Sequence, residues 1–394
     1  MYYYSCMNNS IVPVLEVIMA RRITALPKKL RLFTQEATRL PSSLLLTGPR
    51  GVGKSTFLLH HGRSRRFLYF CADNPLVMAL NLSEVVQSIF MAGYEGVIID
   101  EVHYAQDWSL HLKSLYDAYP AASFWISDSS SLLLRSGNAD LSRRFVHLDM
   151  PIMSFREYLF LETGVIHPRY VPFSEGPALP VQPTAAILSA FGEYRRHGTR
   201  PFYGEGYFIE RMLAVLDKGI HSDVPFFIPR IVDDNLRLMH AIVGTLGMAT
   251  IPRLQVQSLC ADWKIGADKL YTLLALMEAV GILQIIRKEN DRKAKSAGDK
   301  LFFADPVYYE VLGSLVGNAR EAWVATCSKC AGWDVTTSRD KAQADFVISK
   351  EGRRITLEVG GKKKSRKGAD FVIHDDIDYP TATAIPLWLL AMSW

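Results

Sequence analysis

The chain has 394 residues, of which 49% are hydrophobic, and its formal net charge is +5. Because domains usually run to about 100–200 residues, we expect two or three of them. The mildly basic charge does not by itself establish a nucleic-acid partner, and five cysteines in this length do not form a disulfide framework. The longest apolar run near an end, residues 385–394, is far shorter than the about 20 residues that span a bilayer. We expect a soluble, cytoplasmic protein without a membrane partner.

An apolar strand, a glycine-rich loop and a helix are predicted in succession from residue 43. The loop, residues 48–55, matches G-x-x-x-x-G-K-[ST], whose glycines let backbone N–H groups approach phosphate oxygens. Lys54 would reach the β- and γ-phosphates, and Ser55 would ligate Mg²⁺. We therefore predict that ATP and Mg²⁺ bind here. The predicted binding residues are Gly48, Pro49, Arg50, Gly51, Val52, Gly53, Lys54, Ser55 and Thr56.

A second apolar strand ends in two adjacent carboxylates, Asp100 and Glu101. Asp100 would hold the metal together with Ser55, and Glu101 would orient and polarise the attacking water. At the tip of the run 123–127, Ser129 or Ser130 would sense the γ-phosphate, with an ordinary helix cap as the alternative.

Strands and helices alternate through this part of the chain. Such alternation predicts a parallel sheet covered on both faces, with the ligand at the carboxyl ends of the strands. The expected strands are residues 43–47, 66–71, 96–101, 123–127 and 145–149, and the expected helices are 54–61, 82–92 and 108–118.

Four segments resemble motifs of a known family, the prokaryotic AAA+ ATPases that join a P-loop core to a winged-helix segment and a restriction-endonuclease-like tail. The segments are residues 99–108 ("DE…W"), 127–134 ("TGSSSLLL"), 141–144 ("LAGR") and 154–159 ("SFREYL"). The resemblance implies assembly into a ring, commonly a hexamer. It also implies that Arg144 completes the neighbouring subunit's site, with Arg143 as the alternative.

The middle of the chain predicts a winged helix. Helices at 254–263 and 268–280 precede strand-like runs at 282–287 and 300–304. Such a module would place its second helix in a DNA groove and its hairpin loop on the phosphate backbone, and its alternative is a protein-interaction module. The basic residues of the loop that we expect to contact nucleic acid are Lys288, Arg292, Lys293 and Lys295.

The tail carries a pattern similar to that of restriction-type nucleases. Asp345 and Glu358 match the two metal-binding carboxylates, and Glu321 matches an upstream helical one. The lysine that should follow is replaced by Gly360, which favours a degenerate, binding-only remnant over an active nuclease. The basic run Lys362, Lys363 and Lys364 would then hold a nucleic-acid backbone, and one of these lysines can also move into the vacant position.

Cys327 and Cys330 have the spacing of metal ligands but lack a second pair, so we expect two reduced thiols and no zinc.

Taken together, these patterns predict an α/β chain in four parts. They are a P-loop AAA+ core (1–168), a helical lid (169–233), a winged helix (234–312) and a restriction-endonuclease-like domain (313–394). The predicted function is that of a ring-forming ATPase that binds, moves or remodels DNA. The alternatives are a nucleotide-gated switch whose winged helix binds a protein, and an ATP-regulated nuclease.

Overall fold

The computed structural model describes residues 11–129, 141, 143–174, 179–227, 233–249, 252–253, 255–291, 298–314, 316–338 and 344–394. Contacts between residues divide the chain into two units, Met1–Pro151 and Ile152–Trp394. Each unit is described separately below. The finer division into four parts stays a prediction.

The first unit is built on a five-stranded sheet in the order β2-β3-β4-β1-β5, in which every pair of neighbours is parallel. Strand β4 therefore lies between the strand that precedes the glycine-rich loop, β1, and the strand that ends in Asp100, β3. The strands are β1 (Ser43–Thr47), β2 (Phe67–Cys71), β3 (Gly96–Asp100), β4 (Ser123–Ser127) and β5 (Val146–Asp149).

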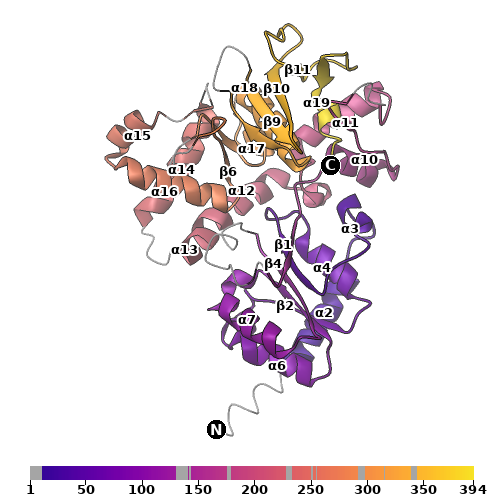
Figure 1. The fold of residues 1–394 in the computed structure, drawn as a ribbon. Coiled ribbons are helices and arrows are strands. Elements are labelled where there is room, and N and C mark those ends of the chain that lie inside the picture. The colour runs from indigo at the N-terminus through magenta and orange to yellow at the C-terminus, as the bar shows by residue number, and fades with distance from the viewer. Residues whose placement is uncertain are drawn as a thin grey trace. The chain divides into compact units, whose positions relative to one another are not determined.

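Helices cover this sheet on both sides, as expected of parallel strands whose residues are buried on both faces. Helix α2 packs against α4, and α6 packs against α7. Figure 1 shows the strands between these two pairs. The helices are α2 (Ile11–Thr24), α3 (Leu32–Glu36), α4 (Lys54–Gly62), α5 (Pro75–Met78), α6 (Leu82–Met91) and α7 (Trp108–Ala118), with a 3₁₀ turn at Val102–Tyr104.

The second unit begins with helices whose ends are set by local sequence. In α10 (Phe155–Thr163), Ser154 and Glu157 form a capping box, and Gly164 ends the helix with a φ of 77°. The further helical elements that precede the five-stranded sheet of this unit are α11 (Ala185–His197), a 3₁₀ helix (Pro201–Glu205), α12 (Phe208–Lys218), a π-helix (Gly219–Asp223), α13 (Val224–Phe227), α14 (Asp233–Met248), α15 (Val256–Trp263), α16 (Ala267–Ala279), α17 (Val307–Val311) and α18 (Val316–Cys330).

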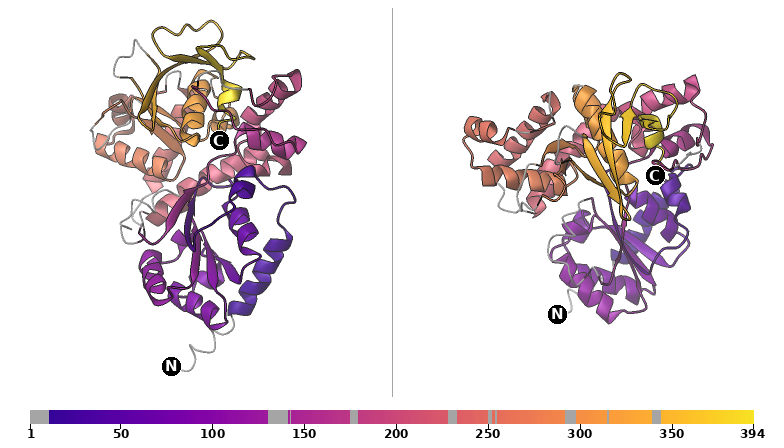
Figure 2. Two further views of the ribbon diagram at one scale, coloured as in Figure 1. Left: turned by 45° about the vertical axis from the view of Figure 1, so that its right-hand side comes forward. Right: turned by 45° about the horizontal axis from the view of Figure 1, so that its top comes forward.

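Two sheets complete the second unit. An antiparallel pair, β6 and β7, follows α16, and a five-stranded sheet in the order β12-β11-β10-β9-β8 follows α18. In the larger sheet the pairs β8–β9 and β9–β10 are antiparallel, while β10–β11 and β11–β12 are parallel. Figure 2 shows the whole fold from two further directions. The strands are β6 (Leu283–Ile286), β7 (Lys300–Phe303), β8 (Asp334–Thr336), β9 (Phe346–Lys350), β10 (Arg353–Gly360), β11 (Phe371–His374) and β12 (Ala384–Pro386), and helix α19 (Leu387–Leu390) follows them.

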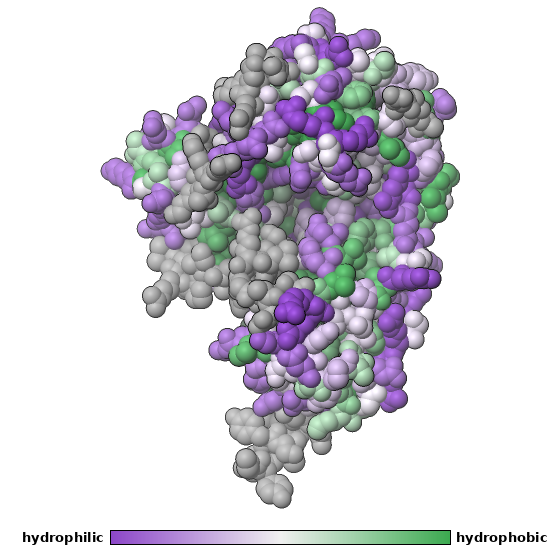
Figure 3. Space-filling view, in the orientation of Figure 1, coloured by the Kyte–Doolittle hydropathy of each residue, from purple (hydrophilic) through white to green (hydrophobic). Residues whose placement is uncertain are grey.

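Hydrophilic residues are spread over much of the coloured surface in Figure 3, with smaller hydrophobic patches between them. Among the residues that the structure describes, no helix combines the length and the apolar character that crossing a bilayer requires.

Candidate functional site

The glycine-rich loop joins β1 to α4 through a backbone that only glycine adopts easily. Gly48, Gly51 and Gly53 have φ values of 145°, 77° and 104°. At Gly48 the neighbouring chain also excludes any side chain, since an added Cβ would lie 2.2 Å from the carbonyl oxygen of Met150. The sequence of this loop therefore fixes a tight turn directly before the N-terminus of α4.

Lys54, the first residue of α4, is buried beneath this turn. Its ammonium group donates hydrogen bonds to the carbonyl oxygens of Gly48 at 2.7 Å and Pro49 at 3.2 Å. Burial lowers the pKa of Lys54, while the carboxylates of Glu101 and Asp100 act in the opposite direction. The loop thus encloses one cation that faces the acidic end of β3.

Three hydroxyl groups from separate segments donate hydrogen bonds to Asp100. Ser55 Oγ donates to its Oδ2 at 2.5 Å, Tyr69 Oη donates to the same oxygen at 2.8 Å, and Ser127 Oγ donates to Oδ1. Ser55 and Asp100 had been predicted to share a metal. Tyr69 and Ser127 had not been foreseen, because only the parallel pairing of β2, β3 and β4 brings them to the same edge.

Glu101 sits directly after β3 in the left-handed region, with a φ of 49°. Its carboxylate lies 3.3 Å from Arg50 Nη1 and accepts a hydrogen bond from Ser129 Oγ at 3.0 Å. Burial raises the pKa of Glu101, while Lys54 and Arg50 act to lower it. Ser129 is thus the predicted serine that contacts this carboxylate, and Ser130 lies outside the described residues.

A buried histidine, His103, lies close to Glu101 and was not identified from the sequence. His103 Nδ1 lies 2.6 Å from Asp128 Oδ2 and 3.7 Å from Glu101 Oε2. Both His103 and Asp128 are fully buried. The signal in the sequence was their position inside two segments that had already been singled out, residues 99–108 and 127–134.

The two arginines nominated for a neighbouring subunit's site lie just before β5. Arg144 donates from Nε and Nη2 to the two carboxylate oxygens of Asp117, each at 3.1 Å, and its guanidinium lies over the ring of Tyr116. Arg143 is exposed.

The three carboxylates of the tail lie close together in the second unit. Lys300 Nζ lies 2.6 Å from Glu321 and 3.2 Å from Asp345, and Lys364 Nζ lies 2.9 Å from Glu358 and 3.7 Å from Asp345. A cavity of about 250 Å³ opens beside Lys300, Glu321 and Asp345. The role of Lys300, at the start of β7, was not foreseen, because it depends on the packing of β7 against α18.

The pKa values of the two central carboxyls move in opposite directions. Burial raises the pKa of Glu358, and the adjacent Asp345 adds to this effect. Burial also opposes ionisation of Asp345, but Lys300 and the hydrogen bond with Glu358 outweigh it and lower its pKa. Two carboxyls with separated pKa values are typical of acid–base and metal sites.

Gly360 occupies the position where the nuclease pattern calls for a lysine. A Cβ added there would lie 2.6 Å from both Cβ and Cγ of Lys364. The side chain of Lys364 therefore fills the space that a side chain at residue 360 would take.

The predicted nucleic-acid residues are only partly described. Lys288, Lys362 and Lys363 are exposed, whereas Arg292, Lys293 and Lys295 lie outside the described residues. Among the described residues no disulfide is formed; Cys327 is buried and Cys330 is half-buried.

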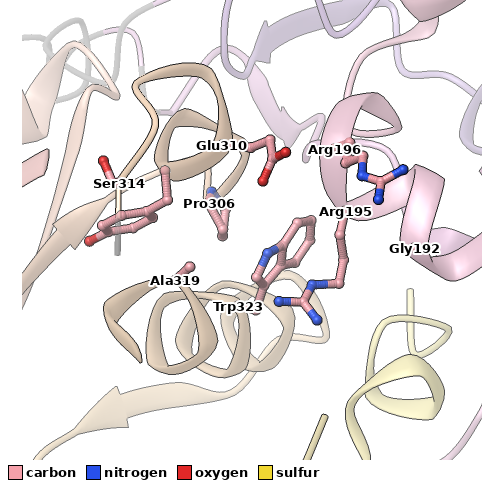
Figure 4. A pocket seen from close by; sticks show the side chains of 9 residues that line it. Gly192, Arg195, Arg196, Pro306, Glu310, Ser314, Ala319 and Trp323 are labelled. Carbon is pink, nitrogen blue, oxygen red and sulfur yellow. The ribbon is translucent and has the colours of Figure 1, made fainter. Parts of the chain in front are cut away.

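A separate cavity of about 210 Å³ lies between α11, α17 and α18 (Figure 4). Arg195, Arg196, Glu310 and Trp323 are among its lining residues. The two guanidinium groups already face carboxylates, Arg195 at 3.8 Å from Asp375 and Arg196 at 2.7 Å from Glu193. We assign no ligand to this cavity.

Residues 41–159 match the model of a protein family described as "AAA domain". A curated relative, an uncharacterised protein of Methanocaldococcus jannaschii, is 28% identical over 370 residues, which cover 82% of this chain and 76% of the relative.

Two solved structures are also similar. One is a Walker-type ATPase of Pyrococcus abyssi (15% identity, 71% of this chain and 93% of the other, TM-score 0.45). The other is the Holliday-junction branch-migration motor RuvB of Thermotoga maritima (14% identity, 76% and 94%, TM-score 0.33).

The family match, the P-loop and the five-stranded parallel sheet agree with one another. The first unit therefore has an α/β fold with a P-loop and a five-stranded parallel sheet, and it resembles P-loop ATPases.

Proposed function

We propose that this chain binds ATP with Mg²⁺ at the loop Gly48–Ser55 and hydrolyses it. The observation that carries the proposal is the 2.5 Å contact between Ser55 Oγ and Asp100 Oδ2. It joins the hydroxyl that ends the glycine-rich loop to the carboxylate that ends the neighbouring motif. Hydroxyl and carboxylate oxygens are ligands that Mg²⁺ prefers, so this donor set fits the ion.

The rest of the loop fits a triphosphate. The φ values of Gly48, Gly51 and Gly53 leave the backbone free of side chains where phosphate would approach, and the N-terminus of α4 adds a favourable dipole. The buried ammonium of Lys54 would exchange its two carbonyl partners for phosphate oxygens. When bound, Mg²⁺ would neutralise charge that develops on the phosphates.

Glu101 would act as the base that orients the attacking water. Its carboxylate is held on two sides, by Arg50 and by Ser129. Burial raises its pKa, and the positive charges of Lys54 and Arg50 oppose this rise. A fixed, ionised carboxylate beside the phosphate site is what water activation requires.

A comparison of single substitutions tests this proposal. Lys54→Ala should abolish saturable binding of a fluorescent ATP analogue. Glu101→Gln should keep that binding and reduce turnover by about 10²–10⁴-fold, the usual contribution of a general base. Glu95→Gln, an exposed site just before β3, is the matched control and should leave both unchanged. Full turnover in Glu101→Gln would refute the role of this residue.

We further propose that the chain assembles into a ring in which Arg144 reaches the neighbouring site. Arg144 is supported by its position just before β5 and by its partly exposed guanidinium. The alternative is that Arg144 serves only to hold Asp117. Alanine variants of Arg144 and Arg143 separate the two arginines. Loss of ATP turnover in Arg144→Ala, with unchanged thermal stability and ATP binding, would support the role of Arg144 in the neighbouring subunit's site. An equal loss of stability would support the structural role, and light scattering with and without ATP would report the oligomer.

We propose that this ATPase acts on DNA. Support comes from the succession α15, α16, β6 and β7 in the second unit, which has the order of a winged helix, and from exposed lysines on two loops. The test is the ATPase rate with single-stranded, duplex and branched DNA across a salt series. Stimulation that fades with salt supports backbone contact. Slow turnover that is indifferent to DNA would favour a nucleotide-gated switch that binds a protein.

A second candidate function is metal-dependent cleavage of nucleic acid in the second unit. The specific observation is that Lys364 fills the space over Gly360 and contacts Glu358 and Asp345, so a lysine is present despite its absence from the motif. The carboxylates would bind a divalent ion, and the lysine would support the attacking water. Mg²⁺-dependent cleavage that is lost in Asp345→Ala and Lys364→Met, and kept in the control Lys28→Met at an exposed lysine of the first unit, would establish it. No cleavage by the wild type would favour a binding-only remnant.

A further inference from the structure

An unusual helical turn in the second unit brings three potential metal ligands together. The π-helix Gly219–Asp223 directly follows α12, and π-helical turns are rare and often occur at functional sites. The turn carries His221, one turn after Asp217 at the end of α12. Both residues face His240 of α14, because the π-helix packs against α14.

The ligand atoms of these three residues already converge. The Nε2 atoms of His221 and His240 are 2.9 Å apart, and His240 Nε2 is 4.0 Å from Asp217 Oδ1. All three ligand atoms lie within 4.8 Å of one another. In a tetrahedral site with bonds of about 2.0–2.1 Å, two ligand nitrogens stand about 3.3 Å apart. Shifts of a few tenths of an ångström therefore suffice for the two histidines, and somewhat more for Asp217.

All three side chains of the cluster are at least partly exposed to solvent. The side chains of Asp217 and His240 are 62% and 39% exposed. His221 is exposed as well. Exposure also leaves a path for an ion to enter and leaves the fourth coordination position open to water.

We propose that Asp217, His221 and His240 bind a first-row transition-metal ion such as Zn²⁺. Two imidazoles and one carboxylate suit Zn²⁺, Ni²⁺ or Co²⁺, whereas Mg²⁺ prefers oxygen ligands alone. The ion would tie the end of α12 to α14. This site is separate from the nucleotide site of the first unit and needs no nucleotide.

The experiment uses the full chain without a histidine tag, freed of metal by a chelator. Co²⁺ binding is followed by its visible absorption, and Zn²⁺ affinity is measured by competition with a chromophoric chelator. The variants are His221→Ala, His240→Ala and the isosteric Asp217→Asn. The matched control is His197→Ala, whose Nε2 lies 3.2 Å from Glu193 in a half-buried pair that offers two ligands instead of three.

The wild type and His197→Ala should bind one equivalent of Zn²⁺ and gain thermal stability that a chelator reverses. Each histidine variant should bind at least about tenfold more weakly, because even loss of a residue that merely orients a ligand costs 10–100-fold. Circular dichroism will show that the variants remain folded, and Asp217→Asn keeps the side-chain volume. The proposal is overturned if the wild type does not bind the ion, or if both histidine variants bind it as tightly as the wild type does. The two histidines would then share only a hydrogen bond. Co²⁺ held through thiolates, revealed by a charge-transfer band, overturns it equally.

Discussion

Replacing Tyr69 with phenylalanine removes one hydroxyl from the centre of the first unit. The Tyr69 side chain is fully buried, donates to Asp100 Oδ2 at 2.8 Å, and accepts a hydrogen bond from Arg22 Nη1 at 2.7 Å. Phenylalanine keeps the packing of the ring but leaves both charged partners short of one hydrogen bond. A hydrogen bond to a charged group contributes about 1.5–3 kcal/mol. We expect the free energy of unfolding of the first unit to fall by about this amount, which is roughly a 10- to 150-fold change in the unfolding equilibrium.

The assay is urea unfolding of the nucleotide-free protein, followed by tryptophan fluorescence and circular dichroism. Tyr94→Phe is the matched control, because its hydroxyl also donates to a carboxylate, Glu16 Oε1 at 2.7 Å, but at the surface. Surface changes of this kind usually stay within about 0.5 kcal/mol. If Tyr69→Phe costs no more than Tyr94→Phe, the inference that the buried hydroxyl of Tyr69 stabilises the first unit through its contact with Asp100 is wrong.

Three further predictions concern the loop, a buried ion pair and a histidine. Gly48→Ala should lose ATP binding, measured by fluorescence titration, because its Cβ would lie 2.2 Å from a carbonyl oxygen. Arg200→Met should lower the free energy of unfolding by about 3–5 kcal/mol in urea titrations, because Asp305, which is 2% exposed, loses the charged partner that lies at 2.5 Å. The control Arg211→Met breaks an exposed ion pair and should lower it by about 0–1 kcal/mol. Burial lowers the pKa of His61 below 6.5, so the unfolded chain binds more protons and stability falls as the pH drops through 6.5 and on through the folded pKa. In that pH window the melting temperature of His61→Gln should vary less with pH than that of the wild type. An unchanged pH dependence would refute the assignment of this effect to His61.

The sequence by itself determined the strands of the first unit and three of its helices. Five short apolar runs separated by helical segments predicted the strands and their parallel arrangement, because burial on both faces leaves few other arrangements. The glycines of the loop and the carboxylates after β3 were likewise predictable, since backbone geometry and phosphate chemistry restrict the residue types. In the second unit the two helices α15 and α16 and the hairpin of β6 and β7 were placed within a few residues.

Only the tertiary structure decided which distant side chains meet. Tyr69 and Ser127 reach Asp100 through strand register, and Lys300 reaches Glu321 and Asp345 through the packing of a hairpin strand on a helix. Lys364 takes the space over Gly360, although the motif suggested that the lysine was missing. The contacts of Tyr69, Ser127 and Lys300 join residues that are 21 to 45 positions apart. No local pattern encodes them, because they arise when separate elements bury their apolar faces against one another and thereby bring polar side chains together.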